Sequence, residues 1–99
     1  MEETPRKEQV LAALRAHLSE LNDEFGVKTL AVFGSIARDE ARSDSDVDIL
    51  VEFSRPIGLF GFVELEERLA AIIGRRVDLG TSDAIKPRIR TQILSEAAV

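Results

Sequence analysis

The chain has 99 residues, of which 44% are hydrophobic and 31% are charged, and its formal net charge is −5. This length and balance are typical of one folded domain, here residues 1–99, rather than of a disordered chain. The negative charge argues against a protein that binds DNA or RNA through the phosphate backbone, because that mode needs a basic surface.

The absence of cysteine excludes disulfides, thiolate metal sites and thiol nucleophiles. No apolar run approaches the roughly 20 residues that span a bilayer, and the first residues lack the basic-then-apolar order of a signal peptide. We therefore expect a cytoplasmic protein without membrane contact. The one histidine, His17, lies within a predicted helix, where a surface position fits better than a role as ligand or base.

The first predicted element is an amphipathic helix from about Pro5 to Glu24. Thr4 is suited to the N-cap and Pro5 to the first helical position. Apolar residues then recur every three or four positions as far as Leu21, and Gly26 is a good terminator. Such a stripe predicts packing into a core.

Residues 27–33, VKTLAVF, are rich in β-branched and apolar side chains and predict the first strand, which ends at Gly34-Ser35. Glycine lets the backbone turn sharply and approach a ligand, and Ser35 can cap a short helix from Ile36 to about Ala41. The free N–H groups of such a helix start favour phosphate. The pair therefore predicts a phosphate seat, although taken alone it is also compatible with a plain turn and cap.

Two arginines, Arg38 and Arg42, lie on or beside this short helix. A guanidinium group suits bidentate contacts with phosphate, so either arginine could bind a nucleotide, and Arg38 is the first candidate. Either could instead simply offset the neighbouring acids Asp39, Glu40 and Asp44, which is the preferred interpretation of the pair.

Asp46 and Asp48 open the second apolar run, which predicts a strand from Asp46 to Phe53. Side chains at i and i+2 of a strand point the same way, with Cα atoms about 7 Å apart. Two such carboxylates repel each other unless a cation lies between them, and Mg²⁺ is usually held by one or two carboxylates together with substrate phosphates. The alternative for an isolated Asp-x-Asp is a solvated strand end.

Arg55-Pro56 interrupt the pattern, and a second helix is predicted from about Leu59 to Ile73, ending at Gly74. Leu59 and Phe60 at its start are expected in the core. If exposed, they would form an apolar spot of the kind that marks a protein interface.

Residues 75–79 predict a short strand in which Asp78 stands between Val77 and Leu79. An acid between two apolar residues is an odd choice for a strand unless it has a task, and exposure at a sheet edge is the alternative.

The last segment predicts a helix with Ser82 or Asp83 as cap, in which Pro87 either starts the helix anew or kinks it. Its apolar residues recur at four-residue steps: Ile85, Ile89 and Ile93. The whole order predicts an α/β fold in which a small mixed β-sheet is covered by helices.

Between the first two predicted strands, ten residues separate Gly34-Ser35 from Asp46-Val47-Asp48. This pattern resembles the signature of the DNA-polymerase-β-like nucleotidyltransferases, in particular the minimal nucleotidyltransferases, and the resemblance covers nearly the whole chain. It implies the polymerase-β-like nucleotidyltransferase core. In that family a third carboxylate on an adjacent strand completes a metal-binding triad, and Asp78 is the residue that matches it.

The resemblance implies Mg²⁺-dependent transfer of a nucleoside monophosphate, AMP from ATP being the first choice, to a hydroxyl group, with release of pyrophosphate. Asp46 and Asp48 would hold Mg²⁺, and Asp78 would bind a second metal or help to take the proton from the attacking hydroxyl. Gly34 and Ser35 would seat the β- and γ-phosphates.

Minimal nucleotidyltransferases commonly act as antitoxins of HEPN-domain RNase toxins, and some place AMP on a toxin tyrosine. The resemblance therefore implies a HEPN-type partner and an antitoxin role. Two alternatives stay open, namely a non-catalytic antitoxin that masks its toxin, and an enzyme that modifies a small molecule such as an aminoglycoside. The absence of an acceptor domain disfavours the second.

Overall fold

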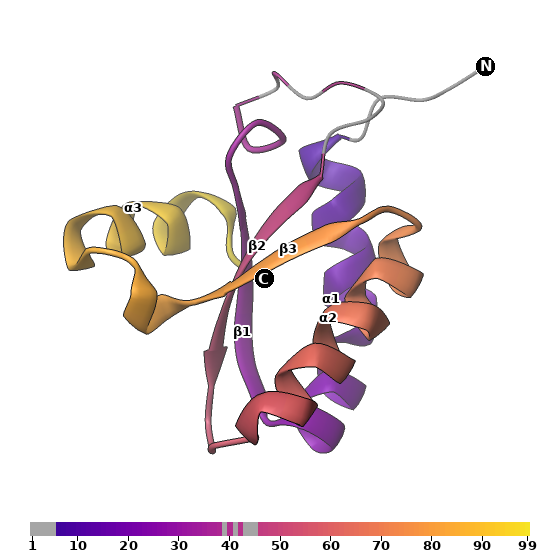
Figure 1. Ribbon diagram of the computed structural model, residues 1–99. Coiled ribbons are helices and arrows are strands. Elements are labelled where there is room, and N and C mark those ends of the chain that lie inside the picture. Colours follow the sequence, from indigo (N-terminus) through magenta and orange to yellow (C-terminus); the bar gives the residue numbers. More distant parts are fainter. Residues whose placement is uncertain (1–5, 39, 41, 43–45) are drawn as a thin grey trace.

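The structure is a computed structural model that describes residues 6–38, 40, 42 and 46–99. Within these ranges the chain forms helices on both sides of a small sheet (Figure 1). The elements in chain order are α1 (Lys7–Phe25), β1 (Val27–Phe33), β2 (Val47–Phe53), α2 (Gly58–Ile73), β3 (Val77–Thr81), the 3₁₀ turn η1 (Ser82–Ala84) and α3 (Pro87–Ala97).

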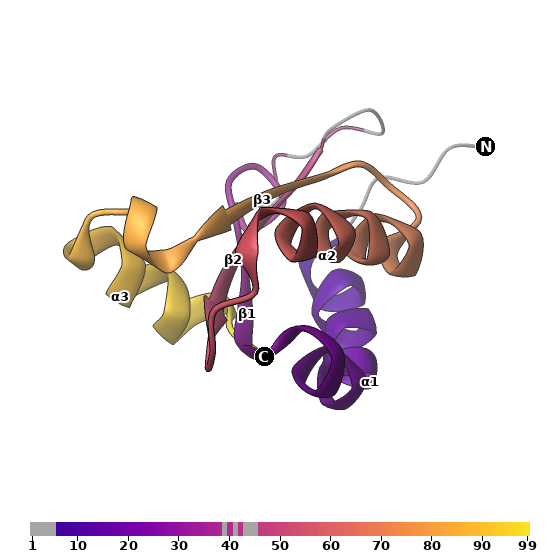
Figure 2. The ribbon, with the colours of Figure 1, turned by 60° about the horizontal axis from the view of Figure 1, so that its bottom comes forward.

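The sheet has the strand order β1-β2-β3, with β2 in the centre. β2 pairs antiparallel with β1 and parallel with β3, so the predicted mixed sheet is confirmed. Helices α1 and α2 cover one face of the sheet and α3 lies on the other (Figures 1 and 2). The parallel pair requires a crossover between β2 and β3, and α2 provides it.

The main core lies between the sheet and the two helices α1 and α2. Alternate residues of the central strand, Val47, Ile49 and Val51, are fully buried there against Leu65 and Leu69 of α2. Because strand side chains alternate, the intervening residues of β2 point to the face that carries α3. Asp48 is one of those intervening residues.

The end of the chain lies along the outer side of β1. The backbone N–H of Val99 donates to the carbonyl oxygen of Leu30 at 2.8 Å, and the Thr29 hydroxyl donates to the carbonyl oxygen of Val99 at 2.7 Å. Ala98 forms an isolated antiparallel bridge with Ala31. The last residues therefore hold α3 against the strand that leads to Gly34.

Most of the predicted boundaries are confirmed to within two residues. The first strand is Val27–Phe33 as predicted, and both long helices end at glycines with left-handed backbone angles, Gly26 (φ 72°) and Gly74 (φ 77°). The predicted cap Thr4 and first helical residue Pro5 lie outside the described residues.

The C-terminal segment resolves one alternative left open by the sequence. Pro87 is the first residue of α3, a position at which its missing N–H costs nothing. Ser82 and Asp83 belong to the separate turn η1 and do not cap α3.

The prediction that Leu59 and Phe60 are core residues is wrong. They are 74% and 87% exposed. The stripe of α2 that faces the core is set by Leu65 and Leu69, and a period of 3.6 residues puts positions 59 and 60 on other sides of the helix.

The predicted short helix from Ile36 to about Ala41 is also wrong for the described residues. Residues 34–38 form turns, and Ala41 lies outside the described part of the chain. Ile36 is buried, so the turn is fixed by core packing. No helix within the described ranges is long and apolar enough to cross a membrane.

Candidate active site

Gly34 ends β1 in the left-handed region of backbone space, with φ 75°. A residue with a side chain rarely adopts this angle. The carbonyl oxygen of Gly34 accepts from the N–H of Arg38 at 3.3 Å, and that of Ser35 accepts from the N–H of Glu40 at 2.8 Å. The two candidate phosphate-binding residues therefore lie in a hydrogen-bonded turn. They do not stand at a helix N-terminus.

The Asp48 side chain lies directly against Gly34. A Cβ atom placed on Gly34 would collide with Oδ2 of Asp48 and stand 3.0 Å from its Cγ. The cause is the register of the sheet, in which Asp48 is the partner of Phe33, the residue before the glycine. Glycine is therefore required here both for its backbone angle and for the space that the carboxylate occupies.

Asp48 and Asp78 are register partners in the parallel pair of β2 and β3. Adjacent strands are about 4.8 Å apart, and paired residues point to the same face. Asp78 is exposed on an edge strand, which was the alternative to a functional role, yet it stands beside Asp48 on the face that carries α3. The structure thus brings together two of the three predicted carboxylates and the Gly-Ser turn.

The electrostatics of Asp48 reflect this crowding. The pKa of Asp48 is raised above its usual value, first by partial burial and then by the negative charges of Asp78 and Asp46, while Arg38 acts in the opposite direction. The charged form of Asp48 is therefore disfavoured without a cation.

Asp46 stands just before β2, and its Oδ1 forms an ion pair with Nε of Arg76 at 3.2 Å. The two side chains are 48% and 84% exposed, so this pair is screened by water and contributes little. Asp46 is consequently turned partly toward Arg76, and it could exchange that partner at small cost.

The donor set suits a hard divalent cation bound together with phosphate. In the part of the chain that the structure describes, no three acidic or histidine side chains form a ready-made metal cage. Mg²⁺ does not require one, since it takes one or two carboxylates and completes its shell with phosphate oxygens and water. Asp48 and Asp78, with Asp46 nearby, offer such carboxylates, and a cation would relieve their mutual repulsion.

The sequence left two roles open for Arg38 and Arg42, namely contact with phosphate and neutralisation of neighbouring acids. Nε of Arg38 lies 3.2 Å from Oε2 of Glu40, which agrees with the offsetting role. Arg38 also acts on Asp48 and lines the adjacent cavity, so it remains a candidate for phosphate contact. Arg42 is exposed, and the acids Asp39 and Asp44 lie outside the described residues.

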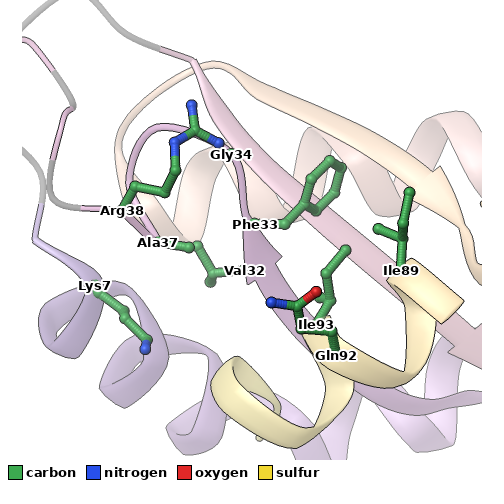
Figure 3. A pocket seen from close by; sticks show the side chains of 9 residues that line it. All are labelled: Lys7, Val32, Phe33, Gly34, Ala37, Arg38, Ile89, Gln92 and Ile93. Carbon is green, nitrogen blue, oxygen red and sulfur yellow. The ribbon is translucent and has the colours of Figure 1, made fainter.

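A cavity of about 280 Å³ opens beside the Gly34 turn, between the start of α1, the end of β1 and α3 (Figure 3). The sequence did not indicate it, because its walls come from opposite ends of the chain. In the sequence, Ile89 and Ile93 stand out only as apolar residues at four-residue steps of a predicted helix, and Lys7 and Gln92 carry no signal. The lining residues are Lys7, Val32, Phe33, Gly34, Ala37, Arg38, Ile89, Gln92 and Ile93.

Comparison with known families identifies the chain's relatives. Residues 14–99 match the model of the nucleotidyltransferase domain. A curated relative, the protein adenylyltransferase MntA of Thermococcus cleftensis, is 47% identical over 89 residues, which cover 90% of each chain. A proposed protein adenylyltransferase of Methanocaldococcus jannaschii is 44% identical over 81% of this chain and 83% of its own.

Solved structures give the same result for the fold. The structure of a proposed minimal nucleotidyltransferase superimposes with a TM-score of 0.73 and 40% identity over 94% of both chains. A chain of a complex between an MNT antitoxin and a tri-AMPylated HEPN toxin of Shewanella oneidensis matches with a TM-score of 0.57, over 88% of this chain and 67% of that one. At 19% identity this second likeness concerns the fold alone.

The expectation drawn from the Gly-Ser and Asp-x-Asp spacing is therefore confirmed. The chain is a nucleotidyltransferase and belongs to the nucleotidyltransferase domain family, with the mixed α/β fold of its minimal members.

Proposed function

We propose that this protein transfers AMP from ATP to a hydroxyl group of a partner protein, with Mg²⁺, and thereby acts as an antitoxin. The observation that carries the proposal is the placement of the Asp48 carboxylate between the Gly34 turn and Asp78. That placement puts a candidate phosphate seat and two candidate metal ligands within reach of one triphosphate.

In this proposal Asp46, Asp48 and Asp78 hold the metal, and the Gly34-Ser35 turn, with Arg38, receives the β- and γ-phosphates. Bound Mg²⁺ would neutralise charge on the phosphates. The hydroxyl oxygen of the acceptor attacks the α-phosphorus, the bond from that phosphorus to the bridging oxygen breaks, and pyrophosphate leaves. Asp78, exposed at the edge of the sheet, is the carboxylate that a protein-borne hydroxyl can approach to give up its proton.

Most of the rate enhancement would come from positioning and charge neutralisation, as in other phosphoryl-type transfers. The rigid part of this positioning is provided by backbone pairing, because Asp48 is fixed between β1 and β3 and Gly34 follows directly from β1.

The nature of the acceptor is supported by the relatives. The relative from Thermococcus cleftensis is named a protein adenylyltransferase, and the Shewanella oneidensis complex contains an AMPylated HEPN toxin together with its MNT antitoxin. We propose a HEPN-type toxin as the partner and a tyrosine as the acceptor. The 99 residues contain no tyrosine, so such an acceptor lies outside them.

Label transfer tests the proposal. The purified protein, Mg²⁺ and ATP labelled at the α-phosphate are incubated with a lysate of the source cells. We expect one labelled protein band with the native chain and none with Asp48→Asn. Asp83→Asn, which removes an exposed carboxylate on η1, is the matched control and should retain the label.

Label that appears only in the small-molecule fraction would contradict a protein acceptor. A specific partner that binds without acquiring label would contradict catalysis and favour masking.

A further inference from the structure

We propose that Gly80 is the residue that admits the acceptor group. Its lack of a side chain lets an aromatic hydroxyl group lie flat on β3, with the hydroxyl oxygen at Asp78. This inference rests on the proposed function, since it adds the position of the acceptor group and a limit on the size of the residue beneath it.

Gly80 has no reason within the described part of the fold to be glycine. Of the six glycines in the chain, four have a left-handed backbone angle, and a Cβ atom on Gly61 would stand 3.2 Å from Cβ of Ile57. Gly80 has neither feature. Its φ lies outside the left-handed region, and beyond its chain neighbours a Cβ atom on it would meet no described atom within 4 Å.

Glycine at such a position weakens the strand, because it adds backbone entropy to the unfolded chain and packs no side chain. A larger residue would fit the free space and would suit a strand better. A glycine inside a strand often marks a place where a ligand or another backbone approaches closely. We therefore infer that the space above Gly80 is kept open for a group from outside the chain.

Gly80 lies on the active-site face of the sheet, two residues after Asp78. Side chains alternate along a strand, so Asp78 and Gly80 share the face that carries α3, whereas Leu79 between them is buried in the main core. The Cα atoms of residues 78 and 80 are about 7 Å apart. A phenol ring above Gly80 can therefore extend its hydroxyl oxygen toward the Asp78 carboxylate.

The cover that this face receives ends between β2 and β3. Leu50 of β2 is the register partner of Gly80 and is fully buried, whereas Gly80 is partly exposed and Asp78 is exposed. Helix α3 packs against β1, which lies on the other side of β2 from β3 (Figure 1). A group that approaches from solvent can therefore reach Gly80 and Asp78 together.

The free edge of β3 offers a less suitable approach. The N–H of Leu79 already donates to Oε2 of Glu66 at 3.3 Å. An acceptor segment that added as a further strand along this edge would have to replace that hydrogen bond. A ring that lies on the face of the strand leaves it in place.

An aromatic hydroxyl suits this position better than an aliphatic one. A flat ring can rest on a backbone that carries no side chain, and its apolar body then leaves water while the hydroxyl stays at the carboxylate. The hydroxyl of serine or threonine lies close to its own backbone, so it would bring the main chain of the partner onto β3. A phenolic side chain reaches Asp78 while its main chain stays outside.

Kinetics of label transfer test the inference. The acceptor is the protein that the native chain labels, purified and offered at a series of concentrations with Mg²⁺ and α-labelled ATP. We expect Gly80→Ala to lower kcat/KM for the acceptor about threefold and Gly80→Val about tenfold or more. Dissociation constants for ATP with Mg²⁺, measured by calorimetry, should stay within about twofold, and the urea midpoint should not fall. Ala12→Val, at an exposed position of α1, is the matched control and should change none of these.

Full activity of Gly80→Val would overturn the inference, and so would a loss of ATP binding equal to the loss of acceptor use. A lower urea midpoint for Gly80→Ala would give the glycine a structural reason and would overturn it as well. Label mapped to an aliphatic hydroxyl would contradict the aromatic acceptor. In each case the transfer of AMP would stand, whereas a native chain that labels no protein would overturn the proposed function and this inference together.

Discussion

Asp48 occupies the space that any side chain at position 34 would need. A Cβ atom on Gly34 would stand 3.0 Å from Cγ of Asp48 and would collide with its Oδ2 atom. The glycine and the aspartate are therefore one unit, although 13 residues lie between them in the sequence.

Replacement of Gly34 by alanine should displace the Asp48 carboxylate and abolish label transfer. Gly34→Ala combines an unfavourable backbone angle with a collision, and we expect a loss of about 1–3 kcal/mol in the free energy of unfolding. Urea denaturation and label transfer would measure the two effects.

Gly74→Ala is the matched control for the backbone angle. Gly74 has φ 77°, but a Cβ atom there would meet nothing within 4 Å. This variant should lose stability from the angle alone and keep its activity. Equal losses of activity in the two alanine variants would contradict the claim that the collision with Asp48 is what matters.

The pH dependence of stability should report the crowding of Asp48. Because its pKa is raised, by burial first and then by Asp78 and Asp46, the folded chain holds the Asp48 proton more tightly than the unfolded chain does. The stabilising contribution of this proton is complete below the unfolded pKa of about 3.9 and is lost as the pH rises through the raised pKa.

Asp48→Asn, which stays neutral, should therefore be more stable than the native chain at pH 7 without metal. The difference should shrink as the pH falls toward about 4. Denaturation at a series of pH values tests this, with Asp83→Asn as the control for the loss of one negative charge. A native chain more stable than Asp48→Asn at pH 7 would show that Asp48 is not destabilised by its neighbours.

Mg²⁺ and ATP together should stabilise the native chain against heat. A ligand that binds only the folded state adds about 2.7 kcal/mol at a concentration of 100 times its dissociation constant. We expect a clear rise in Tm with both components. A chelator should remove most of the rise, and Asp48→Asn should show little of it. An equal rise for ATP without divalent metal would speak against the carboxylates as metal ligands.

The exposed start of α2 should tolerate truncation. Leu59→Ala and Phe60→Ala remove side chains that are 74% and 87% exposed, and each should change the free energy of unfolding by no more than about 0.5 kcal/mol. Leu65→Ala in the buried stripe of the same helix should cost about 2–5 kcal/mol. Losses of similar size at positions 60 and 65 would mean that Phe60 is a core residue after all.

Local patterns predicted the strands and long helices because each carries its own signal. Residues 27–33 are a β-branched run closed by a glycine, and the apolar period of both long helices ends at a left-handed glycine. The prediction of a short helix after Ser35 was wrong because this segment has too few residues to form a helix on its own. Helix nucleation is unfavourable and is offset only over many residues, so the burial of Ile36 sets the backbone path here.

The partnership of Asp48 and Asp78 could not be derived from local patterns. It depends on the parallel register of β2 and β3, which is set by how α2 crosses over the sheet. The family resemblance, rather than the spacing of residues, pointed to Asp78.

The cavity could not be predicted from the sequence either. Lys7 and Gln92 are 85 positions apart and become neighbours of one cavity only through the packing of α1 and α3 around β1.

The most direct test of the central claim compares the position of the label in ATP. The native chain, Mg²⁺ and the partner protein are incubated with ATP labelled at the α-phosphate in one reaction and at the γ-phosphate in another. Nucleotidyl transfer predicts label on the partner from the α-labelled ATP alone. Label from the γ-position would mean phosphoryl transfer, and a partner that binds but takes up neither label would contradict catalysis by this site.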